Sequence, residues 1–445
     1  MSRLELRAAL SLSSIFGMRM LGMFMILPVF ALYAVHLRGT TPALTGLAIG
    51  AYGMTQALLQ IPAGLLSDRI GRKPVIIGGL LLFALGSIVA AEAQTIHLVI
   101  LGRALQGSGA IAAAIMALTA DLTREEHRMK AMATIGMSIG LSFAVAMVAG
   151  PILDKWVGVP GIFWITAVLA MVGIGVVFFV VPTPAVTRMH REAEAVPSQF
   201  GRVLRSGELL RLDFGILVLH MILTATFVVM PLVLRDEAGL AASRHWEVYL
   251  PVMFFSVLAM VPFIIYAERR GQMKPVLLGA VALMTLAELG LYELPVTLID
   301  VGLLLFLFFT AFNLLEAMLP SLISRAAPLD CRGTAMGFYS SSQFLGAFLG
   351  GSIGGLVHGR FGVHGVFLFT ALGALLWLLV AATMTPPRHL ASFIHKVTAR
   401  DQAEAERLSQ QLTGIAGVAE AVVVPGEGVA YLRVDKRVFD ESTLP

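Results

Sequence analysis

Long apolar stretches alternate with short polar ones along most of the chain. Twelve stretches are long enough to cross a membrane, and they lie near residues 11–36, 43–67, 75–93, 96–120, 130–153, 160–182, 212–235, 247–267, 275–293, 298–324, 333–357 and 363–384. About 20 mostly apolar helical residues cross the hydrocarbon layer. The pattern therefore predicts an all-α membrane protein with twelve transmembrane helices in two six-helix halves. The first stretch carries Arg19 and is too long for the apolar core of a signal peptide, so we expect it to be retained.

The composition excludes an ordinary soluble domain. Of the 445 residues, 57% are hydrophobic and 13% are charged, whereas soluble domains contain about 25% charged residues. The single cysteine, Cys331, excludes a disulfide framework and a cysteine-based metal cluster, so neither a metal nor a cofactor is expected. The sequence has no Walker-type phosphate loop, which argues against ATP as the energy source. Acids, histidines and serines do not cluster at catalytic spacing within the spans, so an enzyme is not predicted.

The basic residues indicate how the chain is oriented in the membrane. Of the 32 Lys and Arg residues, 25 fall in one set of alternate loops together with both ends of the chain. Cytoplasmic loops retain Lys and Arg, so this bias predicts cytoplasmic N- and C-termini and a cytoplasmic middle loop. The net charge of +4 is thus a topology signal that also favours membrane lipid, and nucleic acid is not an expected partner.

An internal repeat relates the two predicted halves. Residues 61–71 and 261–271 share proline, acid, arginine and glycine at a shift of 200 residues. Such repeats occur in transporters whose halves are related by an axis along the membrane normal, with the binding site between the halves. We therefore expect an N-terminal half at 1–183, a cytoplasmic linker at 184–211 and a C-terminal half at 212–385.

The loop after the second span carries a recognisable motif. It combines glycines, one acid and basic residues, namely Gly64, Asp68, Arg69, Gly71, Arg72 and Lys73. Over residues 1–385 the chain resembles the major facilitator superfamily, whose motif in this loop has the same defining positions. The resemblance implies that the loop locks the two halves together in one conformation, with Asp68 as a gate residue. Asp121, at the cytoplasmic end of the fourth span, is positioned to pair with Arg72. The alternative is that these basic residues only anchor the topology.

Two further motifs lie in the fourth and fifth spans. Arg103 belongs to an Arg-x-x-Gln-Gly element similar to one in the family, and the resemblance implicates it in proton coupling. A structural hydrogen-bond clamp between helices is the alternative, because an intramembrane guanidinium needs a partner or a water-filled cavity. Gly150-Pro151 matches the family's antiporter signature only in part, which leaves the direction of transport open.

Residues 17–24, 312–320 and 333–346 are similar to the YajR-like subgroup, identified with proton-driven drug exporters of the bacterial inner membrane. Glu316 lies near mid-span, where desolvation disfavours the charged carboxylate and suits it to load and release a proton. It could instead be a structural partner of Arg19 or Arg103. His220 is a second proton candidate, since imidazole titrates near neutrality; a helix-to-helix hydrogen bond is its alternative. Asp68 of the gate motif is also a candidate for proton coupling.

Several polar side chains within the spans are candidates for contact with substrate: Arg19, Gln56, Gln60, Asn313 and Gln343. The glutamines could also serve only to join helices. Many exporters of cationic drugs have an acid in the first span, whereas this chain has Arg19. The charge of the substrate therefore stays open, and anionic or zwitterionic solutes remain candidates.

The composition changes after Pro386-Pro387. A strand near 391–397, a helix near 401–411 and a hairpin over 418–434, with its turn at 425–428, are predicted. The β-α-β-β order indicates most of a ferredoxin-like α+β domain at 386–445, similar to the cytoplasmic domain of the YajR-like subgroup. It ends before the second helix and last strand, so the domain is either short or truncated. It has no cysteine, which excludes copper binding through a Cys-x-x-Cys loop. A role in sensing or docking and a passive stabilising role are both open.

Together these features predict a monomeric secondary transporter that works by alternating access, with proton-coupled efflux of small amphipathic or drug-like molecules as the first hypothesis. A proton-coupled importer of a nutrient or organic anion is the second. A membrane receptor that signals through its tail is the third. The sequence leaves the substrate, the proton stoichiometry and the resting conformation undetermined.

Overall fold

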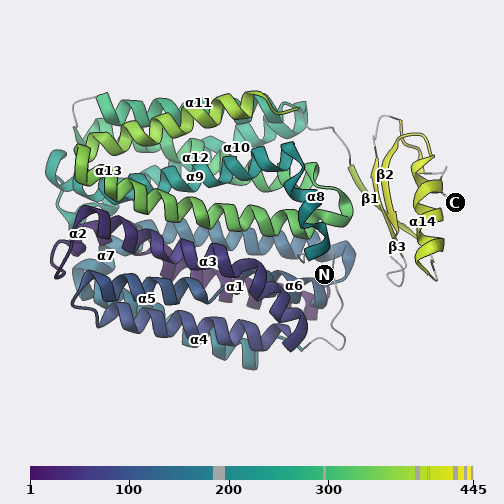
Figure 1. Ribbon diagram of the computed structural model, residues 1–445, viewed down its shortest axis with the longest axis horizontal. Coiled ribbons are helices and arrows are strands. Elements are labelled where there is room, and N and C mark those ends of the chain that lie inside the picture. The colour runs from purple at the N-terminus through teal and green to yellow at the C-terminus, as the bar shows by residue number, and fades with distance from the viewer. Residues whose placement is uncertain are drawn as a thin grey trace.

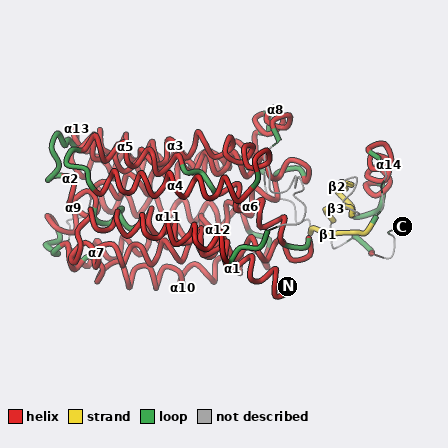
Figure 2. Tube along the Cα trace, turned by 90° about the horizontal axis from the view of Figure 1, so that it is seen from below, coloured by secondary structure: helices red, strands yellow, loops and turns green. Residues whose placement is uncertain are grey.

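The computed structural model describes residues 1–183, 196–293 and 297–385 and, in the tail, residues 391–397, 399, 401–423, 429–434, 438–441 and 444. The bundle of long helices has a small sheet domain beyond one end (Figure 1). Both views place the N-terminus, α8 and this domain at the same end of the bundle (Figure 2). Residues 184–195 of the predicted linker, Pro386-Pro387 and the predicted hairpin turn at 425–428 lie outside the described residues.

The first part of the chain forms seven helices, α1 Arg3–Phe24, α2 Phe30–Ala34, α3 Pro42–Ile70, α4 Arg72–Ala91, α5 Ile96–Ser108, α6 Ala112–Leu122 and α7 Glu125–Phe179. The starts of α1, α3 and α5 follow from hydroxyl side chains that accept otherwise unpaired backbone N–H groups. Ser2 caps α1 in a capping box with Glu5, and Thr41 caps α3 ahead of a proline in the first turn. Inside α7, Gly158 has φ 68° and ψ 174°, which breaks the helix between the predicted fifth and sixth spans.

The second part contains α8 Phe200–Leu204, α9 Gly207–Leu232, α10 Trp246–Arg270, α11 Met273–Glu293, α12 Leu298–Ala326 and α13 Arg332–Ala382. A π-helical turn, Val233–Glu237, extends α9. Gly362, with φ 72°, interrupts α13 between the predicted last two spans. Within the described residues, eight helical segments are long and apolar enough to cross a membrane, so the chain is a multi-pass membrane protein.

The two parts of the chain meet where α3 packs against α13 (Figure 1). Glycines bring the backbones together: a Cβ on Gly46 would collide with the carbonyl oxygen of Gly351, and one on Gly53 with that of Phe344. Such small-residue contacts are typical of helices that pack closely within a membrane. Because Gly46 and Gly53 lie in the first half of α3, the contact is concentrated near the end of the bundle opposite the tail.

A second glycine face joins α13 to α9. Gly346, Gly350 and Gly354 lie four residues apart, and a Cβ on the first two would collide with the carbonyl oxygens of Leu217 and Met221. Gly355, the next residue of α13, packs instead against α3.

The tail forms β1 Ala391–Lys396, α14 Gln402–Thr413, β2 Val418–Val423 and β3 Val429–Val434. The strand order is β1-β3-β2, and both pairs are antiparallel. This is the order of a split β-α-β unit followed by a hairpin strand. A separate small core, which includes Ala405, Leu412 and Leu432, joins α14 to the sheet.

The sheet docks on the end of α12. The Arg433 guanidinium donates from Nη2 to the carbonyl oxygens of Ser324 (2.8 Å) and Ala327 (2.6 Å). These carbonyls belong to a helix C-terminus, where a cation is favoured. Glu420 lies 3.4 Å from Arg433 Nη1 and accepts from the backbone N–H of Leu329 at 3.0 Å. Burial lowers the pKa of Arg433, and the carboxylate of Glu420 opposes that shift. The tail thus holds the helix that carries Glu316.

Removing the Arg433 side chain should release the sheet from α12. Charge-assisted hydrogen bonds contribute about 1.5–3 kcal/mol each, and each 1.4 kcal/mol is a factor of about 10. Cys331, the single cysteine, is buried in the short helix Leu329–Cys331 that β2 contacts. We expect Arg433→Ala to raise the rate of maleimide labelling of Cys331 about tenfold. The matched control is Arg407→Ala, at an exposed arginine of α14. Equal rates in wild type and Arg433→Ala would contradict the docking.

The N-terminus is held by Glu5, whose Oε1 accepts from the backbone N and from Nε of Arg124, both at 3.0 Å. These hydrogen bonds hold the pKa of Glu5 far below its usual range. An acid whose pKa is lowered by folding stabilises the folded state at every pH above its ordinary pKa. This stabilisation is lost as the pH falls below that ordinary pKa. Glu5→Gln should therefore lower the thermal unfolding midpoint by a constant amount between pH 7 and about pH 5. Below that range the difference from wild type should shrink; a difference independent of pH down to pH 3.5 would refute the ionised pairing.

Candidate functional site

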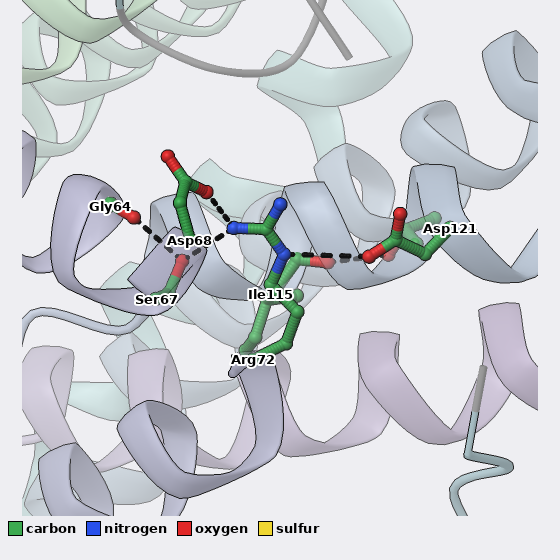
Figure 3. A network of polar contacts seen from close by, with 7 residues as sticks. Gly64, Ser67, Asp68, Arg72, Ile115 and Asp121 are labelled. Atoms are coloured by element: carbon green, nitrogen blue, oxygen red, sulfur yellow. Dashed lines mark hydrogen bonds and ion pairs between the residues drawn. The ribbon is translucent and has the colours of Figure 1, made fainter. Parts of the chain in front are cut away.

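The loop between α3 and α4 is organised around Arg72 (Figure 3). Its guanidinium forms an ion pair with Asp68, donates to Ser67 Oγ at 2.9 Å and lies 3.4 Å from Asp121 Oδ2 at the end of α6. The side chains of Arg72 and Asp121 are almost fully buried, whereas that of Asp68 is 23% exposed. Arg72 therefore ties the loop to α6, within the first part of the chain.

The backbone of this loop requires a glycine. Gly71 has φ 98°, a conformation that residues with a side chain rarely adopt. The turn brings Lys73 into position to donate to the carbonyl oxygen of Val181 (2.7 Å) and to Thr183 Oγ1 (3.0 Å) beyond α7. Arg69 and Gly64 flank this turn on α3.

The repeated loop between α10 and α11 has a related contact. Gly271 is left-handed, with φ 68°, and Glu268 lies 3.7 Å from Arg325 at the end of α12. In each part of the chain an ion pair therefore joins this loop to the end of a later helix. In the first pair the loop supplies the arginine and the helix end the acid, whereas in the second pair the loop supplies the acid and the helix end the arginine.

Arg19 is buried in the first part of the chain, with 1% of its surface exposed. Its Nη2 donates to Gln56 Oε1 at 2.7 Å, and Gln56 Nε2 donates to Gln60 Oε1 at 2.6 Å. The guanidinium carbon lies 5.6 Å from the ring centroid of Tyr52 and 5.4 Å from that of Phe83. Three predicted cavity residues thus form one chain across α1 and α3.

Arg103 lies beside the same tyrosine, 5.2 Å from the ring centroid. It donates to Gln106 Oε1 at 2.7 Å and to the carbonyl oxygen of Ile49 at 3.4 Å. Gln106 in turn donates to Ser87 Oγ at 2.7 Å. These bonds join α3, α4 and α5. They are the contacts expected if Arg103 serves as a structural hydrogen-bond clamp between helices.

Glu316 lies with His220 and Gln343 where α9, α12 and α13 meet. Gln343 Nε2 lies 2.8 Å from His220 Nε2 and donates to Glu316 Oε1 at 3.2 Å, and Glu316 Oε2 is 3.8 Å from His220 Nε2. In the described residues, the polar contacts of Glu316 are with these two side chains and not with Arg19 or Arg103. The Glu316 side chain is 34% exposed and that of His220 10%.

The hydrogen bonds define one consistent tautomer of His220. If Nδ1 carries the proton, it donates to the carbonyl oxygen of Ile216 (3.4 Å) and leaves Nε2 to accept from Gln343. The amide of Gln343 then gives its two hydrogens to the two titratable groups. A proton added at His220 Nε2 would break its contact with Gln343, because Gln343 Nε2 can only donate, whereas a proton on Glu316 Oε2 leaves Oε1 able to accept.

The remaining predicted contact residue, Asn313, donates to Ser256 Oγ on α10 at 3.0 Å. The structure also contains a buried acid that the sequence analysis missed. Glu288 on α11 is fully buried between Thr226 Oγ1 (2.9 Å) and Thr370 Oγ1 (2.7 Å). Its position inside an apolar stretch is the same signal that identified Glu316, and only the structure shows that Glu288 is sealed from the surface.

The model of the Major Facilitator Superfamily matches residues 12–351 and 274–412. The inner membrane transport protein YajR of Escherichia coli strain K12 is 49% identical over 440 residues, which cover 99% of this chain and 96% of that protein. The chain belongs to the major facilitator superfamily, in its YajR-like subgroup. It is therefore a transporter and not an enzyme.

Other superfamily members are more distant. An uncharacterised transporter of Buchnera aphidicola from Acyrthosiphon pisum is 37% identical, over 79% of this chain and 90% of that protein. The multidrug resistance protein MdtH of Aeromonas salmonicida is 26% identical, over 76% and 84%. Among solved structures, the human organic anion transporter MFSD10 has a TM-score of 0.63 at 18% identity, over 85% of this chain and all of that one. At this identity the likeness concerns the fold alone.

The Arg72–Asp121 pair predicts a measurable loss of stability. Removing one partner of a buried ion pair costs about 3 kcal/mol or more, because the other charge is left uncompensated. Asp121→Asn should lower the free energy of unfolding in an SDS titration from mixed micelles by about 1.5–3 kcal/mol, less than for a lone buried charge, because Arg72 keeps its ion pair with Asp68. The control is Asp236→Asn, which breaks an exposed pair with Arg235 and should cost less than about 1 kcal/mol. Equal losses in the two variants would show that the buried pair has no special weight.

Proposed function

We propose that the chain is a secondary transporter that exports small amphipathic molecules in exchange for protons by alternating access. The observation that carries the proposal is the contact of Glu316, Gln343 and His220 across three helices. Intramembrane titratable groups are costly and usually serve a function. The Glu316 side chain is 34% exposed, and its Oε2 atom is buried without a hydrogen-bond partner. Glu288, by contrast, is closed off and has a structural role.

The proposed architecture has twelve spans. Gly158 and Gly362 divide the two longest helices, α1–α2 and α5–α6 each form one span, and the halves are 1–183 and 212–385, joined by the linker at 184–211. Both termini are assigned to the cytoplasm of the bacterial inner membrane, on the positive-inside bias and because they lie at one end of the bundle. The tail at 386–445 is assigned as a ferredoxin-like domain and the working unit as a monomer.

The same topology suggests which side of the transporter is closed. The glycine contacts between α3 and α13 lie at the start of α3, the end assigned to the outer side. At the other end of α3, Asp68 pairs with Arg72 of its own half. We therefore assign this conformation to a state that is closed outside. In the alternate state, the gate motif Gly64 to Lys73 with Asp121 would engage the second half.

Proton transfer would act through Gln343. While Glu316 is ionised, the amide of Gln343 holds it and His220 together and thereby joins α9 and α12 to α13. Protonation of Glu316 removes the charge that strengthens this hydrogen bond. The packing of the three helices then depends on the proton load, as alternating access requires. Arg103 would act indirectly, by fixing helices of the first half.

One observation favours a second function, proton-coupled import of an organic anion. The first span carries Arg19 rather than an acid, and the two buried arginines make the first half positive. An anion that binds there favours the protonated, neutral form of Glu316 over the ionised form. The two ligands would then bind together, which is the condition for symport.

The test is proton flux in respiring inside-out vesicles, with a panel of amphipathic cations, anions and neutral compounds. We expect at least one compound to dissipate the pH gradient in wild type and to lose this effect in Glu316→Gln, because the amide cannot carry a proton. The matched control is Glu293→Gln, at an exposed carboxylate at the end of α11.

Two results would count against proton exchange through Glu316. If Glu316→Gln responds as wild type does, coupling resides elsewhere, with His220 the next residue to test. If inside-out vesicles do not respond but an acid pulse drives uptake of an anion in right-side-out vesicles, the importer is the correct function.

A further inference from the structure

The two buried arginines of the first half lack a counter-ion. In the described residues, every polar contact of Arg19 and Arg103 is with an amide, a backbone carbonyl or an aromatic ring, and none is with a carboxylate. Their exposed fractions are 1% and 2%. Ring faces and amides reduce the cost of burying a guanidinium, but they do not neutralise its charge.

Four polar atoms of this cluster also lack hydrogen-bond partners. They are Nε and Nη1 of Arg19, Nε of Arg103 and the hydroxyl of Tyr52. Buried donors without partners each cost about 1–3 kcal/mol. Three of the four atoms are guanidinium nitrogens, which can only donate. The missing group is therefore an acceptor, and the uncompensated charge requires that it be negative.

Tyr52 connects this cluster to the junction between the halves. Its ring lies between the two arginines, and it contacts Phe344 of α13 with ring centroids 6.0 Å apart. A solute that enters between the halves thus meets aromatic side chains first.

We infer that Arg19, assisted by Tyr52 and Arg103, binds the carboxylate of the transported molecule. The substrate class is an amphipathic organic anion with an apolar or aromatic body. Arg19 offers two free donors on one planar group, Nε and Nη1, the geometry that matches the two oxygens of a carboxylate. The anion site itself does not depend on the proposed transport function. Only the step that identifies the bound anion with the transported solute rests on that function.

The experiment is thermal unfolding of the purified full chain in detergent. Sodium benzoate or sodium octanoate replaces sodium chloride at constant total sodium, so that ionic strength is fixed and chloride is the reference anion. We expect a saturable rise of about 2–4 °C in the unfolding midpoint. Benzamide, a neutral analogue of benzoate, should have no such effect.

Variants assign the effect to Arg19. Arg19→Gln should abolish the shift, whereas Arg38→Gln, at an exposed arginine outside the bundle, should retain it. If Arg19→Gln fails to fold, Arg19→Lys keeps the charge but loses the planar fork, and it should bind benzoate at least about tenfold more weakly. Glu316→Gln should retain the shift, which separates failure of the anion site from failure of proton exchange.

Three outcomes would overturn the inference. The first is that neither carboxylate raises the midpoint above its value in chloride, which would make chloride an equally good counter-ion. The second is that benzamide stabilises the protein as much as benzoate does. The third is that the shift persists unchanged in Arg19→Gln or Arg19→Lys.

Discussion

A charged side chain among membrane helices is no longer hydrated. The surrounding helices must therefore supply the hydrogen bonds and the compensating charge that water would have supplied. Much of the polar structure of this transporter follows from that requirement. In the first half, Arg19 and Arg103 share the faces of one tyrosine and are fixed by glutamine amides. In the second half, Glu288 lies between two threonine hydroxyls and Glu316 beside an amide and an imidazole. Among the membrane helices, therefore, Arg19 and Arg103 lie in the first part of the chain and Glu288 and Glu316 in the second.

Charges at the ends of the bundle follow a different rule, because there they find ionic partners. Arg72 pairs with two acids, Glu268 with Arg325, and Glu5 with Arg124. Each pair joins the end of one helix to another helix or loop, so these contacts can open and close without exposing a lone charge to hydrocarbon. Arg433 extends the scheme to the tail, where it binds the carbonyls at the end of α12. The tail therefore contacts the helix that carries Glu316.

Apolar length was enough to predict most helix bounds to within about five residues and the β-α-β-β order of the tail, although α1 begins at Arg3 and not near residue 11. These features are local, so they appear in the sequence. The contact of Asp121 with Arg72 was expected from the sequence, whereas the partners of buried polar groups within the spans were not predictable in the same way. Glu316 was considered as a partner of Arg19 or Arg103, yet it lies with Gln343 and His220. Helix rotation decides such contacts, and one residue of rotation moves a side chain by about 100°.

The opposite charges of the two halves also bear on the sign of coupling. An anion bound at Arg19 would by charge repulsion favour the neutral, protonated form of Glu316, so that anion and proton would favour each other's binding. A cationic solute would have the opposite effect and would compete with the proton, as exchange requires. A carboxylate could still be exported in exchange for protons. The anion-bound protein would then have to favour the outward-open state, and the protonated protein the inward-open state, more strongly than this electrostatic attraction favours binding of both together. The charge of the solute and the direction of transport are therefore one question, and Arg19 and Glu316 are the two residues through which it can be answered.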